Sequence, residues 1–216
     1  KGNLLKQKFF INRRSFLLAF TVVCAIPKII FAKENNSDDT LRRHFLGSNT
    51  APIKIKEYFS LTCSHCANFH NKTLPEFKEK YIDTGRVQLE FIDYPLDRLA
   101  IIAAALARTI PTEKGYIEAI GILLKKQKDW AYSNKPIDEL QSISKMFGIS
   151  SKKFEEIAQD IPLMQKIVNK MEQETKSFNI QSTPTFIINN EHKISGALSF
   201  KEFEDKLFEF TKLKKS

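Results

Sequence analysis

The sequence predicts an α/β fold in which an all-helical segment interrupts a sheet-containing domain. Residues 53–59 (IKIKEYF) alternate apolar and charged side chains as a strand does, and a helix is expected directly after them. Residues 98–178 carry a helical pattern almost throughout. The remaining residues return to two short strands and an amphipathic helix. This order of elements is typical of an α/β domain with a helical insertion.

Glycine, serine and proline mark the ends of the expected elements. Gly148 should close one helix as a C-cap, Ser150 and Ser151 should cap the next, and Pro162 should start the last long one. Pro75 lacks an N–H and should interrupt or restart the helix that begins near Cys63. The other expected elements are a short helix or arm at 41–47, a strand at 87–92, helices at 99–110, 116–124 and 137–147, strands at 185–189 and 192–197, and a helix at 200–213.

The formal net charge of +9 comes mainly from the N-terminal residues of this 216-residue chain. Residues 1–32 hold six lysines and arginines and no acid, whereas residues 33–216 hold 28 basic and 25 acidic side chains. A surface of mixed charge lacks the basic stripe that phosphate binding needs. No nucleic-acid partner is therefore expected.

Residues 1–32 have the layout of an export signal. A basic stretch is followed by an apolar run at 16–26, and Pro27 breaks the run before a small-residue exit at Ala32. The run is short of the roughly 20 residues that a spanning helix needs. Arg13-Arg14 resembles the twin-arginine signature. We expect a cleaved signal of the twin-arginine or general type and export to the periplasm. An uncleaved anchor in the inner membrane and an ordinary buried helix are the alternatives.

Cys63 and Cys66 are the cysteines expected in the exported chain, because Cys24 would leave with the signal. Cys63-Ser-His-Cys66 stands where the strand feeds the helix. The free N–H groups and the dipole of a helix N-terminus stabilise a thiolate there, and a cationic His65 would add to this. The spacing brings both sulfurs to one helix face. Cys63 is expected to be the exposed nucleophile and Cys66 the shielded resolving thiol.

A C-x-x-C motif alone also fits a static disulfide or a soft-metal site. His70 could supply a third metal ligand, but closed zinc sites take four ligands and no second cysteine pair exists. Haem attachment needs a histidine directly after the second cysteine, and Ala67 stands there. The first two alternatives stay open at this point.

A second motif lies more than a hundred residues later, where Thr183 and Pro184 precede an apolar strand. The two motifs together resemble the DsbA family of exported thiol–disulfide oxidoreductases over roughly residues 51–210. The resemblance implies a thioredoxin-like domain in two parts, 51–95 and 178–216, separated by a helical insertion at 96–177, with a linker or arm at 33–50. The matching residues are Glu57-Tyr58-Phe59-Ser60, Cys63-x-His65-Cys66, Pro95-Leu96 and Thr183-Pro184-Thr185-Phe186-Ile187-Ile188-Asn189.

The resemblance also implies roles for residues around the cysteines. The Thr183–Pro184 bond should be cis and lie beside the sulfurs, where the backbone of Thr183 can pair with a substrate peptide as an added strand. Glu57 stands six residues before Cys63 and should lie beneath the pair, where it could relay the proton of Cys66. The alternative for Glu57 is an ordinary strand acid facing solvent.

The function expected from this resemblance is an oxidase that donates disulfides to secreted or periplasmic proteins. Its substrates would be cysteine-containing exported proteins, a DsbB-like quinone-linked membrane protein would reoxidise it, and no metal or organic cofactor is needed. We expect a monomer, since residues 33–50 are too few for the dimerisation module of family isomerases. Ser64 and Thr183 replace the proline and valine common in strongly oxidising members. A disulfide isomerase or reductase and a periplasmic soft-metal-binding thiol protein are therefore the alternatives.

Three aromatic residues complete the expectations. Trp130 and Tyr132 are interpreted as packing or boundary aromatics. Phe69 is a candidate for an exposed groove that receives unfolded substrates.

Overall fold

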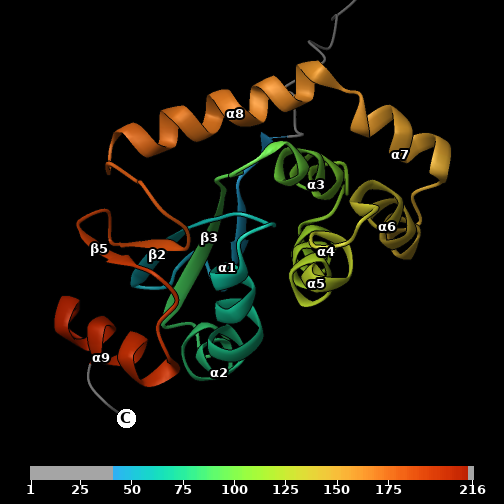
Figure 1. Ribbon diagram of the computed structural model, residues 1–216. Coiled ribbons are helices and arrows are strands. Elements are labelled where there is room, and N and C mark those ends of the chain that lie inside the picture. The colour runs from blue at the N-terminus through green and yellow to red at the C-terminus, as the bar shows by residue number, and fades with distance from the viewer. Residues whose placement is uncertain (1–40, 214–216) are drawn as a thin grey trace, which may run out of the picture. The chain divides into compact units, whose positions relative to one another are not determined.

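The computed structural model describes residues 41–213, so the expected signal at 1–32 and the start of the 33–50 arm lie outside the described residues. The strands form one mixed sheet in the order β1-β3-β2-β4-β5 (Figure 1). Strands β2 and β3 are parallel, and the other neighbouring pairs are antiparallel. The strands are β1 (His44–Leu46), β2 (Ile53–Phe59), β3 (Val87–Asp93), β4 (Thr185–Ile188) and β5 (His192–Ser195).

The expected strands are confirmed, and β1 is one that the sequence did not indicate. Residues 41–47 were expected to form a short helix or arm, but three of them pair antiparallel with β3 instead. A strand this short has too few residues for an alternating pattern to be recognised. Its pairing with β3, a segment about forty residues away, therefore decides its structure.

After a short loop at residues 60–63, the chain that follows β2 is helical without a break from Ser64 to Ile82. It begins as α1 (Ser64–Asn68), widens into a π-helical turn (Phe69–Thr73), narrows to α2 (Leu74–Phe77) and ends in a second π-helical turn (Lys78–Ile82). Pro75 stands in the first turn of α2. It has no N–H for the turn before it, so the α-helical ladder restarts at this point, as expected.

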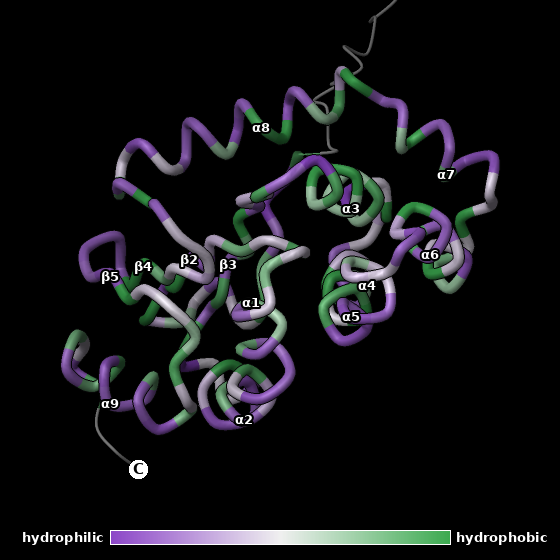
Figure 2. The backbone as a smooth tube through the Cα atoms, in the orientation of Figure 1, coloured by the Kyte–Doolittle hydropathy of each residue, from purple (hydrophilic) through white to green (hydrophobic). Residues whose placement is uncertain are grey.

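The chain between β3 and β4 is helical, and α9 (Phe200–Phe210) follows β5. Gly148 adopts the left-handed conformation expected of a C-cap, with φ of 75°. Ser150 caps the next helix by accepting a hydrogen bond from the backbone N–H of Lys153. Helix α3 is nearly enclosed, and Figure 2 shows it as mostly hydrophobic. The helices are α3 (Arg98–Arg108), α4 (Glu113–Lys125), α5 (Gln127–Trp130), α6 (Pro136–Ser144) with a 3₁₀ turn (Lys145–Phe147), α7 (Ser151–Ala158) and α8 (Ile161–Lys176).

Side chains of β2 alternate between the two faces of the sheet. Ile53, Ile55 and Phe59 belong to the larger core, which also holds the aromatic residues of α2 and α9. Tyr58 lies in a smaller cluster of buried residues on the other face. Glu57 has the same parity as the isoleucines. The alternation therefore places this carboxylate on the face of the larger core.

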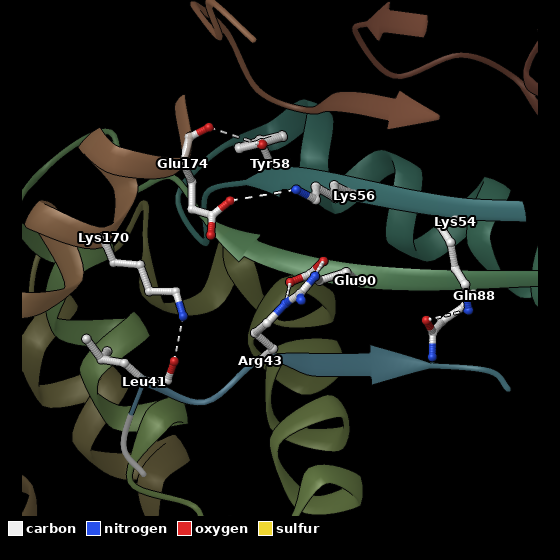
Figure 3. A network of polar contacts seen from close by, with 9 residues as sticks. All are labelled: Leu41, Arg43, Lys54, Lys56, Tyr58, Gln88, Glu90, Lys170 and Glu174. Atoms are coloured by element: carbon white, nitrogen blue, oxygen red, sulfur yellow. Dashed lines mark hydrogen bonds and ion pairs between the residues drawn. The ribbon is translucent and has the colours of Figure 1, made fainter. Parts of the chain in front are cut away.

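Polar contacts attach α8 to the opposite face of the sheet (Figure 3). The Tyr58 hydroxyl donates a hydrogen bond to the backbone carbonyl of Glu174, and the carboxylate of Glu174 lies 3.9 Å from Lys56 Nζ. Lys170 donates to the carbonyl of Leu41 at 2.6 Å, which holds the segment before β1. Helix α8 thus connects β2 to the start of the described chain. No helix within residues 41–213 is long and apolar enough to cross a membrane.

A buried ion pair joins the end of β3 to α3. Arg108 Nε donates to the carboxylate of Asp93 at 2.6 Å, and the side chains are 2% and 9% exposed. Another nitrogen of the same guanidinium donates to the carbonyl of Arg42. The helical segment and the sheet are therefore fixed to each other beside the end of β3. The loop after β2, residues 60–63, lies at the same edge, since the N–H of Tyr94 donates to the carbonyl of Phe59.

Candidate active site

Cys63 lies at the junction of β2 and α1 and forms the N-cap of the helix. Its N–H donates to the carbonyl of Ser60 at 3.2 Å, and its own carbonyl accepts from the N–H of Ala67 at 3.1 Å. These bonds turn the backbone from strand into helix. The N–H groups of His65 and Cys66 then face the sulfur of Cys63 and stabilise its charge.

The two thiols of the motif have opposite environments, and both are free. The pKa of Cys63 is lowered to about 5, chiefly because the thiol of Cys66 donates a hydrogen bond to its sulfur. Burial raises the pKa of Cys66, and the bond to Cys63 and the charge of Glu57 raise it further. Cys63 is therefore a thiolate at neutral pH and Cys66 a thiol. The fully buried Cys66 fits a resolving role. Cys63 is only 8% exposed, so the expectation of an exposed nucleophile is wrong: its sulfur lies against the backbone of Thr183.

The second motif meets the first at Cys63. The Thr183–Pro184 bond is cis, which confirms the expectation. The Sγ of Cys63, when protonated, donates to the backbone carbonyl of Thr183 at 3.4 Å. The hydroxyl of Thr183 is buried and has no hydrogen-bond partner in the described chain. A hydroxyl in this state can turn toward the Cys63 thiolate, and Thr183 does help to lower the pKa of Cys63.

Glu57 is completely buried on the core face, so the alternative of a solvent-facing strand acid is wrong. Its carboxylate oxygens lie 2.9 and 3.1 Å from Nε2 of His70, which is itself buried. His70 stands four residues after Cys66, one helical turn along the same face. The structure therefore gives this histidine a carboxylate partner beneath the cysteines, a role that sequence reasoning missed. Helical spacing from Cys66 was the available signal.

The remaining sequence-based expectations have mixed outcomes. The side chain of His65 is exposed, and residues 41–213 show no hydrogen bond from its imidazole to Cys63; its backbone N–H makes the contact instead. Phe69 is 1% exposed and packs on Phe186 and Phe203, so its expected place in an exposed groove is wrong. Within the described residues, no group of three or more histidine, cysteine or acidic side chains is arranged to hold a metal.

Three residues of the helical segment hold the loop before α1, and sequence reasoning assigned none of them to the site. Buried Gln127 donates from Nε2 to the carbonyls of Leu61 and Cys63, at 2.8 and 3.0 Å. The hydroxyl of Tyr132 donates to the carbonyl of Thr62 at 3.4 Å. Asp97, the N-cap of α3, accepts from the Thr62 hydroxyl at 2.7 Å.

Trp130 and Tyr132 therefore differ in role, although both were expected to be packing or boundary aromatics. Trp130 is fully buried and donates to the carbonyl of Leu123, as a packing residue does. Tyr132 is 60% exposed and stands beside the active-site loop. Their exposure differs because Trp130 is the last residue of α5, whereas Tyr132 lies in the turn that follows the helix.

Comparison with known proteins shows which family the chain belongs to. A family model described as thioredoxin matches residues 39–207. The chain belongs to the thioredoxin family. Among solved structures, this thioredoxin-family chain resembles alpha-DsbA1 of Wolbachia pipientis, with a TM-score of 0.70 and 30% identity over 78% of this chain and 90% of that one. The fold is also similar to BdbD of Bacillus subtilis, with a TM-score of 0.66 and 21% identity over 77% of this chain and 91% of that one.

Curated relatives carry names of the same kind. A protein-disulfide oxidoreductase of Rickettsia typhi is 30% identical over 162 residues, which is 75% of this chain and 58% of that protein. The aligned part thus spans little more than half the length of that relative. DsbA of Buchnera aphidicola is 22% identical over 207 residues, 93% of this chain and 94% of that protein. The thioredoxin-like fold with a helical insertion and the DsbA-like thiol–disulfide oxidoreductase family are therefore both confirmed.

Proposed function

We propose that this chain is an exported oxidase that donates the Cys63–Cys66 disulfide to cysteine-containing proteins. The observation that carries the proposal is the low pKa of Cys63 beside a buried, protonated Cys66. A stabilised thiolate stabilises the reduced form of the protein, and this makes the corresponding disulfide a strong oxidant. The same observation weighs against the alternative of a reductase, because a reductase requires a less stable reduced form.

The reaction begins from the oxidised pair. A substrate thiolate attacks the Sγ of Cys63, the Cys63–Cys66 bond breaks, and Cys66 leaves with the electron pair and takes up a proton. A second substrate thiolate then attacks the substrate sulfur of the mixed disulfide and releases Cys63 as a thiolate. Two electrons pass in total and the substrate gains one disulfide. Of the two protons that the substrate thiols give up, Cys66 takes one and solvent the other, so the protein is left with the Cys66 thiol and the Cys63 thiolate.

Glu57 and His70 are placed to serve the proton that Cys66 takes up. The raised pKa of Cys66 means that its sulfur must be protonated as it leaves, and the charge of Glu57 contributes to that raised pKa. His70 keeps the carboxylate in position through its Nε2. We assign Glu57 the role of proton relay and His70 that of a positioning residue.

The backbone beside Pro184 supplies the place for the substrate peptide. An extended peptide whose cysteine reaches Cys63 can hydrogen-bond to the backbone of Thr183, in the manner of an added strand. The proposal includes export to the periplasm, action as a monomer and reoxidation by a DsbB-like quinone-linked membrane protein. Similarity to alpha-DsbA1 and to the Buchnera DsbA supports the assignment of export.

The test is a stoichiometric transfer of one disulfide. Oxidised protein is mixed with an equal amount of a reduced two-cysteine peptide, and the thiols of both are blocked with a mass-tagging reagent and counted. We expect the peptide to lose two thiols as the protein gains two. The Cys66→Ala variant cannot form the Cys63–Cys66 disulfide, so it is the control that should leave both peptide thiols in place. Absence of transfer from the native protein would contradict the proposal.

A further inference from the structure

A groove opens beside the active site, between the outer face of residues 64–72 and residues 124–132 of the helical segment. Its volume is about 570 Å³. It begins at Ser64, the residue directly after the nucleophile, and Tyr132 stands at its wall with 60% exposure. The backbone of Thr183, in the segment just before β4, borders Cys63 from a different part of the fold. The groove is therefore a second surface that a peptide bound at Cys63 can reach.

Three lysines give the groove its charge, and no acidic side chain lines it. Lys72, Lys125 and Lys128 are exposed, and the structure shows no ion pair for any of them within residues 41–213. Nearby Asp129 is instead paired with Lys126 at 3.8 Å. Elsewhere on the surface, several lysines do have acidic partners: Lys78 with Asp83, Lys80 with Glu204, Lys114 with Glu118, and Lys201 with Asp205.

The other polar groups of the groove are suited to carboxylates as well. Asn68 carries amide donors into the same lining, and Asn71 donates one amide hydrogen to the Leu124 carbonyl at 3.5 Å and has a second one left. The helix from Cys63 to Lys72 covers roughly 13 Å at about 1.5 Å per residue. An extended peptide crosses that distance in about four residues. Carboxylates within about four positions of a bound cysteine would thus reach the lysines.

We propose that this lysine groove selects substrates whose reacting cysteine is flanked by acidic residues. The proposal rests on the disulfide-donating function above and names the class of substrate that the same site prefers. Attraction between the lysines and the acidic flank raises the local concentration of such peptides and speeds their association. Every substrate forms the same kind of disulfide bond with Cys63. We therefore expect the charge of the residues that flank the substrate cysteine to change the rate of oxidation and not the products.

The experiment compares three reduced two-cysteine peptides that differ only in flanking residues, which are glutamate, glutamine or lysine. Their rates of oxidation by the oxidised protein are divided by their rates with the neutral 2-hydroxyethyl disulfide, which corrects for differences in thiol pKa. We expect the order glutamate, glutamine, lysine, with about a 10-fold span at low salt that collapses at high salt.

Two triple variants separate the groove from the overall charge of the protein. K72Q/K125Q/K128Q should abolish the preference, while K145Q/K152Q/K212Q, which alters three exposed lysines elsewhere, should preserve it. Equal corrected rates for the glutamate and lysine peptides would overturn the proposal, and so would a preference that survives in the groove variant. Failure of all three peptides to be oxidised would instead contradict the oxidase function itself.

Discussion

At the scale of single residues, the low pKa of Cys63 depends chiefly on one hydrogen bond between two sulfurs. The bond from the Cys66 thiol is the largest cause of the low pKa of Cys63, ahead of the backbone N–H groups of the helix. The charge of a helix N-terminus was the reason available from the sequence. It contributes, but the resolving cysteine contributes more.

Removing the donor should therefore raise the pKa of Cys63. We expect Cys66→Ala to move it upward from about 5, and Cys66→Ser, which keeps an O–H donor, to move it less. The measurement is the ultraviolet absorbance of the thiolate, at roughly 240 nm, as a function of pH. A titration midpoint that stays near 5 in Cys66→Ala would show that the Cys66 side chain is not the cause.

Glu57 provides the second prediction at this scale. Glu57→Gln keeps the size of the side chain and its contact with His70 but removes the charge and the proton acceptor. We expect the step in which Cys66 leaves or attacks to slow by about 10²-fold, with a changed pH profile. Glu118→Gln, at an exposed carboxylate of α4, is the control. A variant that is less stable but keeps the native pH profile would show that Glu57 is only structural.

At the scale of elements, the helical segment does more than cover the sheet. Its helices α3 and α5 and the residues after α5 provide the hydrogen bonds that hold residues 61–63, through Asp97, Gln127 and Tyr132. These residues are more than thirty positions away from the loop they hold. The sequence pattern identifies helices, but it does not show which loop a helix side chain will meet.

The contribution of Gln127 can be measured directly. Gln127→Ala leaves two buried carbonyls, those of Leu61 and Cys63, without their donor. We expect the free energy of unfolding to fall by about 2 kcal/mol, the typical cost of unsatisfied buried polar groups, as measured by urea denaturation. Gln165→Ala, on the exposed surface of α8, should change it by less than about 0.5 kcal/mol. Equal effects would contradict a positioning role.

The accuracy of the sequence-based fold followed from the length and regularity of each element. Strand β2 and the helix after it were correctly placed because their apolar periodicity is unbroken, and Gly148 and Ser150 marked helix ends through local backbone chemistry. Strand β1 was missed because its pairing is purely tertiary. Among site residues, Cys63 and Cys66 form a local motif. His70 stands one turn after Cys66, but its contact with Glu57 depends on how β2 packs against the π-helical turn after α1.

At the scale of the whole molecule, the redox state and the stability are linked through Cys63. Its pKa is about 5 in the folded reduced protein, against an ordinary value of 9.0. A lowered folded-state pKa stabilises the fold fully above pH 9, and this contribution is lost as pH falls toward 5. The oxidised protein has no Cys63 thiolate and lacks the contribution altogether.

The resulting prediction concerns the difference between the two redox forms. The free energy of unfolding of the reduced protein, minus that of the oxidised protein, should fall as pH decreases from 9 to 5 and level off below 5. Urea denaturation of both forms over this pH series gives the difference, and the oxidised form serves as the control for all other titrating groups. A difference that is constant, or that grows as pH falls, would contradict this linkage.

The central claim is that the Cys63–Cys66 disulfide is donated rather than kept, and the reduction potential of the pair tests it most directly. The described chain is equilibrated with glutathione buffers, and its oxidised and reduced fractions are separated after acid quenching. We expect a potential near the roughly −120 mV of strong disulfide oxidants. A potential near the roughly −270 mV of thioredoxin would contradict it and would show that the pair accepts disulfides instead.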